Sequence, residues 1–382
     1  MINQTEQTLY RLSNLNAEQT RISYQLSTGK VIDKGSEDSS LYSREIYIDD
    51  RIRTYEGIQT QIERTTAQNN VSDSTIGEMK ALFELAKTEI IKANTDTTSD
   101  EGKKAIALNL AGIKENLFDL ANTQVEGEYL FAGSDSSVIP FTKDSDGNVT
   151  YEGNNIARKI SVDDGSYRER GVNGYDVMTY PSSTALSGET LNFKEADTII
   201  DENGDIWKLN AAKTDIEMLK KDGTVDTSVA SKAVDSNDGL TPPTYTINDI
   251  GSDSGTKFEA RSNIFDLIDD LVNTLNKVDS DGNAIDDDTR DALLSENQEK
   301  FSESYDALNL AHSELGSKNQ MFEISLERVT SKLTQYTILS QEVGAADLTK
   351  LAIESAALEL TYTSLYSTIQ RTNELSLTNF LN

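Results

Sequence analysis

The sequence contains no cysteine and one histidine in 382 residues. Without cysteine the chain can form neither a disulfide bond nor a thiolate zinc site, although this says nothing firm about its compartment. His312 has no second histidine with which to make a His-pair metal site, so we expect it to be a packed or half-buried structural residue. We expect no metal and no cofactor.

Long apolar runs and basic charge are also scarce. No segment approaches the ~20 apolar residues needed to span a bilayer. Residues 1–26 lack the basic and apolar regions of a cleavable signal peptide, so any export is expected to leave the N-terminus intact. With 35 basic and 65 acidic residues, the formal net charge is −30. Because like charges repel, we expect no binding to nucleic acid or to anionic membrane surfaces, and without a spanning segment we expect no membrane insertion.

Motifs for catalysis are nearly absent. The pair Gly29-Lys30 lacks the upstream glycine of a phosphate-binding loop and is followed by Val31. Two acidic stretches begin like calcium loops, at Asp144 and Asp279, but both lack the required glycine and the bidentate carboxylate. We interpret both stretches as turns. The sequence therefore does not predict an enzyme.

Two seven-residue apolar repeats are the strongest patterns present. The C-terminal repeat consists of Leu294, Phe301, Leu308, Leu315, Phe322, Val329, Tyr336 and Val343. The N-terminal repeat consists of Ile48, Tyr55, Ile62, Asn69, Ile76, Phe83 and Ile90. A strict period of seven keeps one seam of a helix against a partner helix. We therefore predict a mainly α fold with a long antiparallel helical rod, or coiled coil, formed by the N- and C-terminal segments.

Asn69 is the one polar residue in these repeats. A polar residue at a seam position can fix the register of two helices, or it can make a lateral contact with another subunit. A solvated position on a long helix explains Asn69 equally well.

The middle of the chain, residues 134–260, is predicted to be a β-rich outer insertion. All four prolines and the single tryptophan fall there, and proline breaks helices. We predict one hairpin from 138–142 and 149–151. A second, from 198–200 and 206–209, would turn at Asn203-Gly204 in type I′ geometry. Shorter helices at 106–120 and 264–278 are predicted to flank the insertion.

Weaker amphipathic stripes occupy both ends of the chain, and neither end is able to bury its stripe alone. An ordinary helical-bundle core is one explanation of such stripes. A matching surface on a neighbouring copy is the simplest cover, so we predict an assembly interface. Its residues are Leu9, Leu12, Leu15, Ile22, Leu26, Leu358, Tyr362, Leu365 and Ile369.

Short motifs resemble the flagellin family. The segment 26–32, Leu-Ser-Thr-Gly-Lys-Val-Ile, followed by Glu37-Asp38, is similar to that family's N-terminal segment, and the stripe ending at 375–377 is similar to its terminal helix. The segment 127–134, Gly-Glu-Tyr-Leu-Phe-Ala-Gly-Ser, resembles the members that join hook to filament. The motif residues are Ser27, Thr28, Gly29, Gly127, Tyr129, Phe131 and Gly133. A purely structural reading of the second motif is a helix exit into a strand, with Tyr129 and Phe131 on one strand face.

The resemblance implies three domains. Residues 1–42 with 345–382 would form a terminal coiled-coil assembly domain, 43–133 with 261–344 a helical rod domain, and 134–260 the β-rich outer domain. Residues 181–255 resemble nothing that we recognise.

The resemblance also implies partners and a location. We expect self-association into a ring, contacts with the preceding hook-associated junction protein and with flagellin, and an export chaperone at the C-terminal helix. The protein would be an extracellular part of the bacterial flagellum, exported by the flagellar type III apparatus without signal cleavage. Two alternatives stay open, namely a filament-forming flagellin and an enzyme or adhesin carried by the insertion.

Overall fold

A computed structural model describes residues 2–95, 97–145, 147–220, 224–237, 244–248, 257–279 and 282–381, with side chains described from residue 6 to residue 371. Some predicted features lie outside these residues. They are Asp146 and Asp281 of the two turns, Pro242, Pro243, and the side chains of 375–377.

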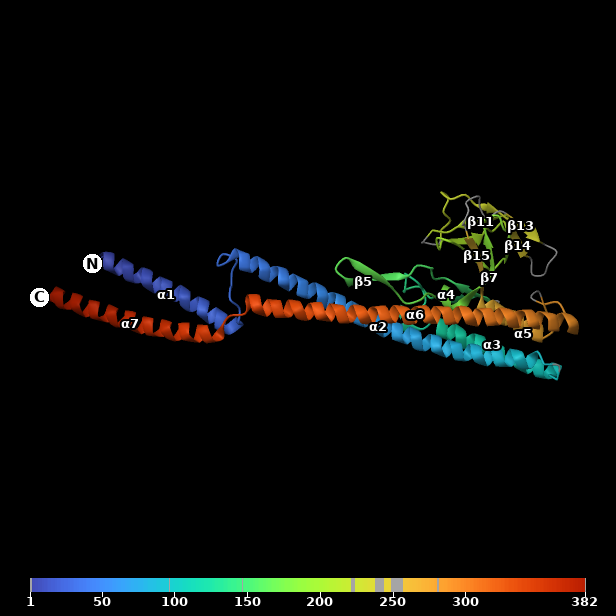
Figure 1. Ribbon diagram of the computed structural model, residues 1–382, viewed down its shortest axis with the longest axis horizontal. Helices are drawn as coiled ribbons and strands as arrows, with labels where there is room; N and C mark the ends of the chain where they lie inside the picture. The colour runs from blue at the N-terminus through green and yellow to red at the C-terminus, as the bar shows by residue number, and fades with distance from the viewer. Residues whose placement is uncertain are drawn as a thin grey trace. The chain divides into compact units, whose positions relative to one another are not determined.

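Both ends of the chain form long helices and its middle is rich in β-strands, as predicted (Figure 1). The described helices are α1 (Ile2–Thr28), α2 (Ser39–Ala93), α3 (Asp100–Ala121), α4 (Gly174–Met178), α5 (Ile264–Leu275), α6 (Asp287–Gly344) and α7 (Leu348–Leu381). The first strands form hairpins: β1 (Gln124–Val125) with β2 (Glu128–Tyr129), β3 (Phe141–Lys143) with β4 (Val149–Tyr151), and β5 (Arg158–Asp163) with β6 (Ser166–Arg170).

The chain divides into two compact units, Met1–Thr60 with Leu326–Asn382, and Gln61–Ser325. Helices α2 and α6 contribute residues to both units. The division into three domains stays a prediction.

In the second unit, α2 and α6 run antiparallel and bury the parts of the predicted seams that lie there, residues 62–90 and 294–322. The ring centroids of Phe83 and Phe301 lie 5.3 Å apart, and Asn69 Nδ2 donates to Asn319 Oδ1 at 2.8 Å. Asn69 is only 2% exposed, so it is a buried register contact within the chain and not a solvated position. Both repeats are confirmed as core seams, although Tyr336 and Val343 are half-buried.

The two shorter helices pack on each other beside this pair, with Phe118 of α3 and Phe265 of α5 in an edge-to-face contact of 6.2 Å. Both were predicted, but the second was placed too far along the chain. Helix α5 ends at Leu275 because Lys277 takes a left-handed backbone (φ 60°), so Val278 lies outside it.

Two further sheets form the outer part of the insertion. A six-stranded sheet has the order β12-β11-β10-β9-β15-β7, and a three-stranded sheet has the order β13-β14-β8. Their strands are β7 (Thr179–Leu186), β8 (Leu191–Lys194), β9 (Thr198–Asp201), β10 (Ile206–Leu209), β11 (Asp215–Met218), β12 (Lys232–Ala233), β13 (Asp235–Asn237), β14 (Thr244–Ile247) and β15 (Lys257–Asn263). Trp207, Tyr245 and Phe258 belong to the apolar core that the two sheets share. We call this part the outer sandwich.

Both predicted hairpins form. Phe141 pairs with Tyr151, and Ile200 pairs with Ile206. The prediction of a type I′ turn was wrong. That turn needs a positive φ at both of its central residues, and of Asn203 and Gly204 only Gly204 has one (81°). The Asp201 carboxylate instead accepts hydrogen bonds from the backbone N–H groups of Asn203 (2.9 Å) and Asp205 (3.0 Å) and holds a longer loop.

Candidate assembly surface

The terminal helices α1 and α7 lie side by side and antiparallel within the first unit (Figure 1). Arg21 of α1 forms an ion pair with Glu354 of α7 at 3.1 Å, and Tyr362 Oη donates to Asn16 Oδ1 at 2.5 Å. The ion pair is partly exposed and the hydrogen bond is exposed, and surface ion pairs contribute about 0–1 kcal/mol. Polar contacts of this kind orient the two helices but hold them together only weakly.

The predicted interface residues differ widely in burial. Only Ile22 is buried, at 3% exposure, while Leu9 (61%) and Leu26 (43%) are exposed. The half-buried members are Leu12, Leu15, Leu358, Tyr362, Leu365 and Ile369. The half-buried members on α7 lie 7, 11, 14 and 18 residues after buried Leu351, so they share the face turned toward α1. Their role in assembly stays a prediction.

A second apolar face of α7 was missed by the sequence reasoning. Ile353 (67% exposed) and Leu360 (73% exposed) are seven residues apart, on the side of the helix opposite Leu351 and Leu358. Tyr10 of α1 (70%) and Tyr366 (56%) are similarly exposed. The seven-residue spacing of Ile353 and Leu360 could have indicated this second face. The longer apolar stripe at 351–369 obscured that pattern. All four side chains are more than half exposed.

The first family motif shapes the connection after α1. Thr28 Oγ1 donates to Tyr24 O at 2.7 Å, Ser27 Oγ donates to Tyr24 O at 2.9 Å, and Gly29 takes a positive φ of 71° that ends the helix. Gly29 O then accepts from Ala346 N at 2.8 Å. The motif therefore ties the end of α1 to the link between α6 and α7.

The second family motif is a packing point in the second unit. Gly127 turns the β1–β2 hairpin with φ 81°, and Phe131 is fully buried. The carbonyl of Phe131 accepts from Gly174 N at 2.7 Å and from Tyr151 Oη at 3.0 Å. A Cβ on Gly133 would lie 2.1 Å from a backbone oxygen, so no other residue fits there.

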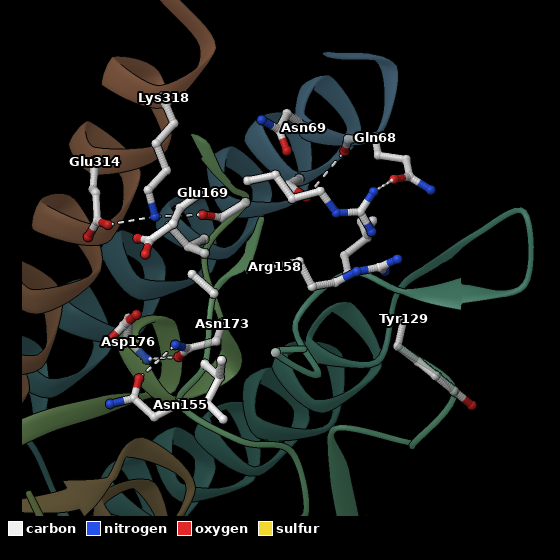
Figure 2. Close-up of a pocket in the computed structure, with 18 of the residues that line it drawn as sticks. Gln68, Asn69, Tyr129, Asn155, Arg158, Glu169, Asn173, Asp176, Glu314 and Lys318 are labelled. Carbon is white, nitrogen blue, oxygen red and sulfur yellow. Dashed lines mark hydrogen bonds and ion pairs between the residues drawn. The ribbon is translucent and has the colours of Figure 1, made fainter. Parts of the chain in front are cut away.

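The predicted strand face shared by Tyr129 and Phe131 was wrong. Strand β2 ends at Tyr129, and Phe131 follows in irregular backbone, where it joins the helical core. Figure 2 shows the Tyr129 side chain lying apart from the other labelled residues. The two aromatic groups therefore have separate surroundings.

A polar cavity of about 240 Å³ lies beside this motif, between α2, α6 and the segment 155–173 (Figure 2). Arg158 and Arg170 donate to Glu128 at 2.9 and 3.0 Å. Burial raises the pKa of Glu128, but these hydrogen bonds outweigh it and lower that pKa to about 2. The residues around the cavity clamp the segment 155–173 onto the helices.

His312 bridges α6 and α2, with Nε2 3.0 Å from Asp73 Oδ1 and the side chain 25% exposed. This agrees with the half-buried structural histidine that was predicted. Within the described part of the chain no group of three His, Cys, Asp or Glu side chains is arranged to hold a metal ion. Of the helices described, none combines the length and the apolar character needed to cross a membrane.

The chain is similar in sequence to known proteins of the bacterial flagellum. Residues 2–136 match the family model for the bacterial flagellin N-terminal helical region. The chain is 25% identical to flagellar hook-associated protein 3 of Salmonella typhimurium over 73% of its own length and 87% of that protein's. It is 25% identical to flagellar hook-associated protein 3 of Escherichia coli over 66% of its own length and 77% of that protein's.

Among solved structures, the chain resembles flagellar hook associated protein-3 from Legionella pneumophila, with a TM-score of 0.52 and 16% identity. That match covers 78% of this chain and 98% of the other. At this identity the likeness shows a shared fold. The resemblance predicted from the sequence is confirmed.

Proposed function

We propose that this chain, which resembles the flagellin family and within it flagellar hook-associated protein 3, is a structural component of the bacterial flagellum. It joins the hook to the filament as a mechanical adapter and assembles through its terminal helices. The observation that carries this proposal is the outer apolar face of α7, where Ile353 and Leu360 are more than half exposed. Covering them with a neighbouring subunit stabilises by about 1.5–3 kcal/mol for each side chain.

The partners follow from the same resemblance. The protein forms a ring with copies of itself, contacts the preceding hook-associated junction protein on one side and flagellin on the other, and meets an export chaperone at its C-terminal helix. It reaches the flagellum through the type III apparatus without signal cleavage. Weak helix pairs such as α1–α7 gain much of their stability on assembly, which couples folding to incorporation.

Filament-forming flagellin is the less supported alternative. The two relatives described above are both hook-associated proteins, and the chain matches each of them over most of its length. The similar proteins are structural, and we propose that this chain likewise performs no catalysis. An adhesin or enzyme within residues 181–255 is tested by deleting that segment. Loss of binding or activity with motility intact would give the segment a role of its own.

The interface is tested by Leu360→Asp. This side chain is 73% exposed, so the subunit still folds, but a charge buried by a neighbour costs several kcal/mol and prevents incorporation. Leu365→Asp has the same expected effect but also disturbs a half-buried side chain.

Leu108→Asp is the matched control, since Leu108 is 76% exposed on α3, which belongs to the other compact unit. Each variant is expressed in a strain that lacks the wild-type gene, and incorporation is measured by blotting purified flagella. Normal incorporation of Leu360→Asp and Leu365→Asp would refute the terminal-helix interface.

A further inference from the structure

Ionisable groups gather where the outer sandwich meets α5, along a cavity of about 1050 Å³. Asp266, Asp269 and Asp270 of α5 line this cavity, and so does Asp197, from the loop after β8. We call these four aspartates, with Lys114 of α3 and Lys194 of β8, the sandwich seam. Lys114 donates to Asp269, and Lys194 Nζ lies 3.0 Å from Asp270 Oδ2.

Hydrogen bonds hold Asp197 on the sandwich side of the seam. It is 5% exposed, and its carboxylate accepts from Ser262 Oγ at 2.5 Å, from the backbone N–H of Lys194 at 2.8 Å and from Ser182 Oγ at 3.2 Å. These three hydrogen bonds satisfy the buried carboxylate.

Asp266 differs from the other three aspartates of the seam. Among the described residues it makes no hydrogen bond or ion pair, whereas Asp269 has Lys114, Asp270 has Lys194 and Asp197 has its ring of donors. Burial raises the pKa of Asp266, the charges of Asp269 and Asp270 raise it further, and Lys114 opposes them, which leaves it at about 7.

The other charged groups near Asp266 do not neutralise it. Tyr180 on β7 is buried, and its own pKa is raised by burial and by Asp197, so it stays uncharged. Arg261 on β15 donates to Thr179 and Glu259, and Lys143 on β3 donates to Glu115. Ionised Asp266 therefore faces its three neighbouring carboxylates with only Lys114 and Lys194 to balance them.

We propose that the sandwich seam is a pH-sensitive joint, which docks the outer sandwich on α5 more firmly below neutral pH than above it. With Asp266 protonated the seam holds three negative and two positive charges. With Asp266 ionised it holds four negative charges in a partly desolvated cleft, where like-charge repulsion is strong. The proposal does not depend on the flagellar role.

The direction with pH follows from proton linkage. The docked chain holds the Asp266 proton up to about pH 7, whereas an undocked aspartate releases it near its ordinary pKa of 3.8. Docking is therefore strongest below that lower value and weakens as pH rises toward 7, with little further change beyond. The equilibrium constant for local opening rises about tenfold for each pH unit in the middle of this window and more slowly close to pH 7, which gives roughly 15-fold from pH 5.5 to pH 7.

Hydrogen exchange of the full-length protein tests the joint, with exchange times scaled to the intrinsic rate at each pH. Backbone amides of Leu191–Lys194 and Lys257–Leu275 should lose protection from pH 5.5 to 7 and then level off. Asp266→Asn, which is neutral throughout, should keep its protection across this range. Asp119→Asn, which removes an exposed carboxylate on α3, should behave like the wild type.

Either of two results overturns the proposal. One is wild-type protection in these segments that does not change between pH 5.5 and 8. The other is an Asp266→Asn variant that retains the full pH dependence. If that variant does not fold, the wild-type series decides alone, because a dependence that fails to level off near pH 7 excludes Asp266 as its cause.

Discussion

The buried amide pair between α2 and α6 allows a quantitative test of how these helices are registered. Asn69 Nδ2 donates to Asn319 Oδ1 at 2.8 Å, and Asn69 is 2% exposed. A net hydrogen bond contributes about 0.5–1.5 kcal/mol, and a buried group left without its partner loses about 1–3 kcal/mol. Asn69→Ala should therefore destabilise the protein by about 1–3 kcal/mol.

A double-mutant cycle isolates the pair from the cavities that alanine leaves. The coupling energy between Asn69→Ala and Asn319→Ala should be about 1 kcal/mol. Once one substitution has removed the hydrogen bond, the second destabilises the protein by less than it would alone. Asn94, the first residue after α2, and Gln298 of α6 provide a control, because they make an exposed amide hydrogen bond of 2.9 Å. Their coupling should be at most about 0.2–0.5 kcal/mol.

Urea unfolding followed by far-ultraviolet circular dichroism gives each free energy of unfolding, and a constant m-value shows that the unfolded state is unchanged. Additivity of the two changes at Asn69 and Asn319 would refute the reasoning. Equal coupling in the buried and the exposed pair would refute it as well, because burial is what distinguishes them.

Two further predictions concern the core around the second motif and its stability in acid. Gly174→Ala places a Cβ 2.7 Å from Phe141 and 2.8 Å from Tyr151, so the melting temperature should fall by an amount equivalent to about 1–3 kcal/mol. Gly112→Ala is the control, because its Cβ meets nothing within 4 Å on the exposed side of α3. This variant should raise the melting temperature slightly. The lowered pKa of Glu128, about 2 against an ordinary 4.5, stabilises the fold above pH 4.5 and is lost as pH falls toward 2. Glu128→Gln should therefore flatten the loss of stability in acid titrations, and an unchanged acid profile would contradict this assignment.

The helical part of the fold was predictable because its core repeats along the chain. Ile76, Phe83 and Leu308 recur at the period of a helix seam, and all three are buried. The polar part of the same seam was not predictable. Gln68, Ser72 and other polar side chains of α2 are also buried, and a sequence pattern weighs such residues as surface.

The outer sandwich could be predicted only in part. Its hairpins are local and are indicated by their turns, but strand β15 pairs with β7 and β9, which lie far away in the sequence. No local pattern encodes such pairings. The candidate interface could likewise be predicted only in part. Helix α7 carries apolar groups on two faces, and the longer stripe at 351–369 indicates only one of them.

The central claim is that the protein sits at the joint between hook and filament, and immunogold labelling of intact flagella tests it most directly. An antibody raised against residues 134–260 reports position and copy number together. The account predicts a single band of gold at the boundary between hook and filament. Label along the whole filament would contradict it and make the protein a flagellin.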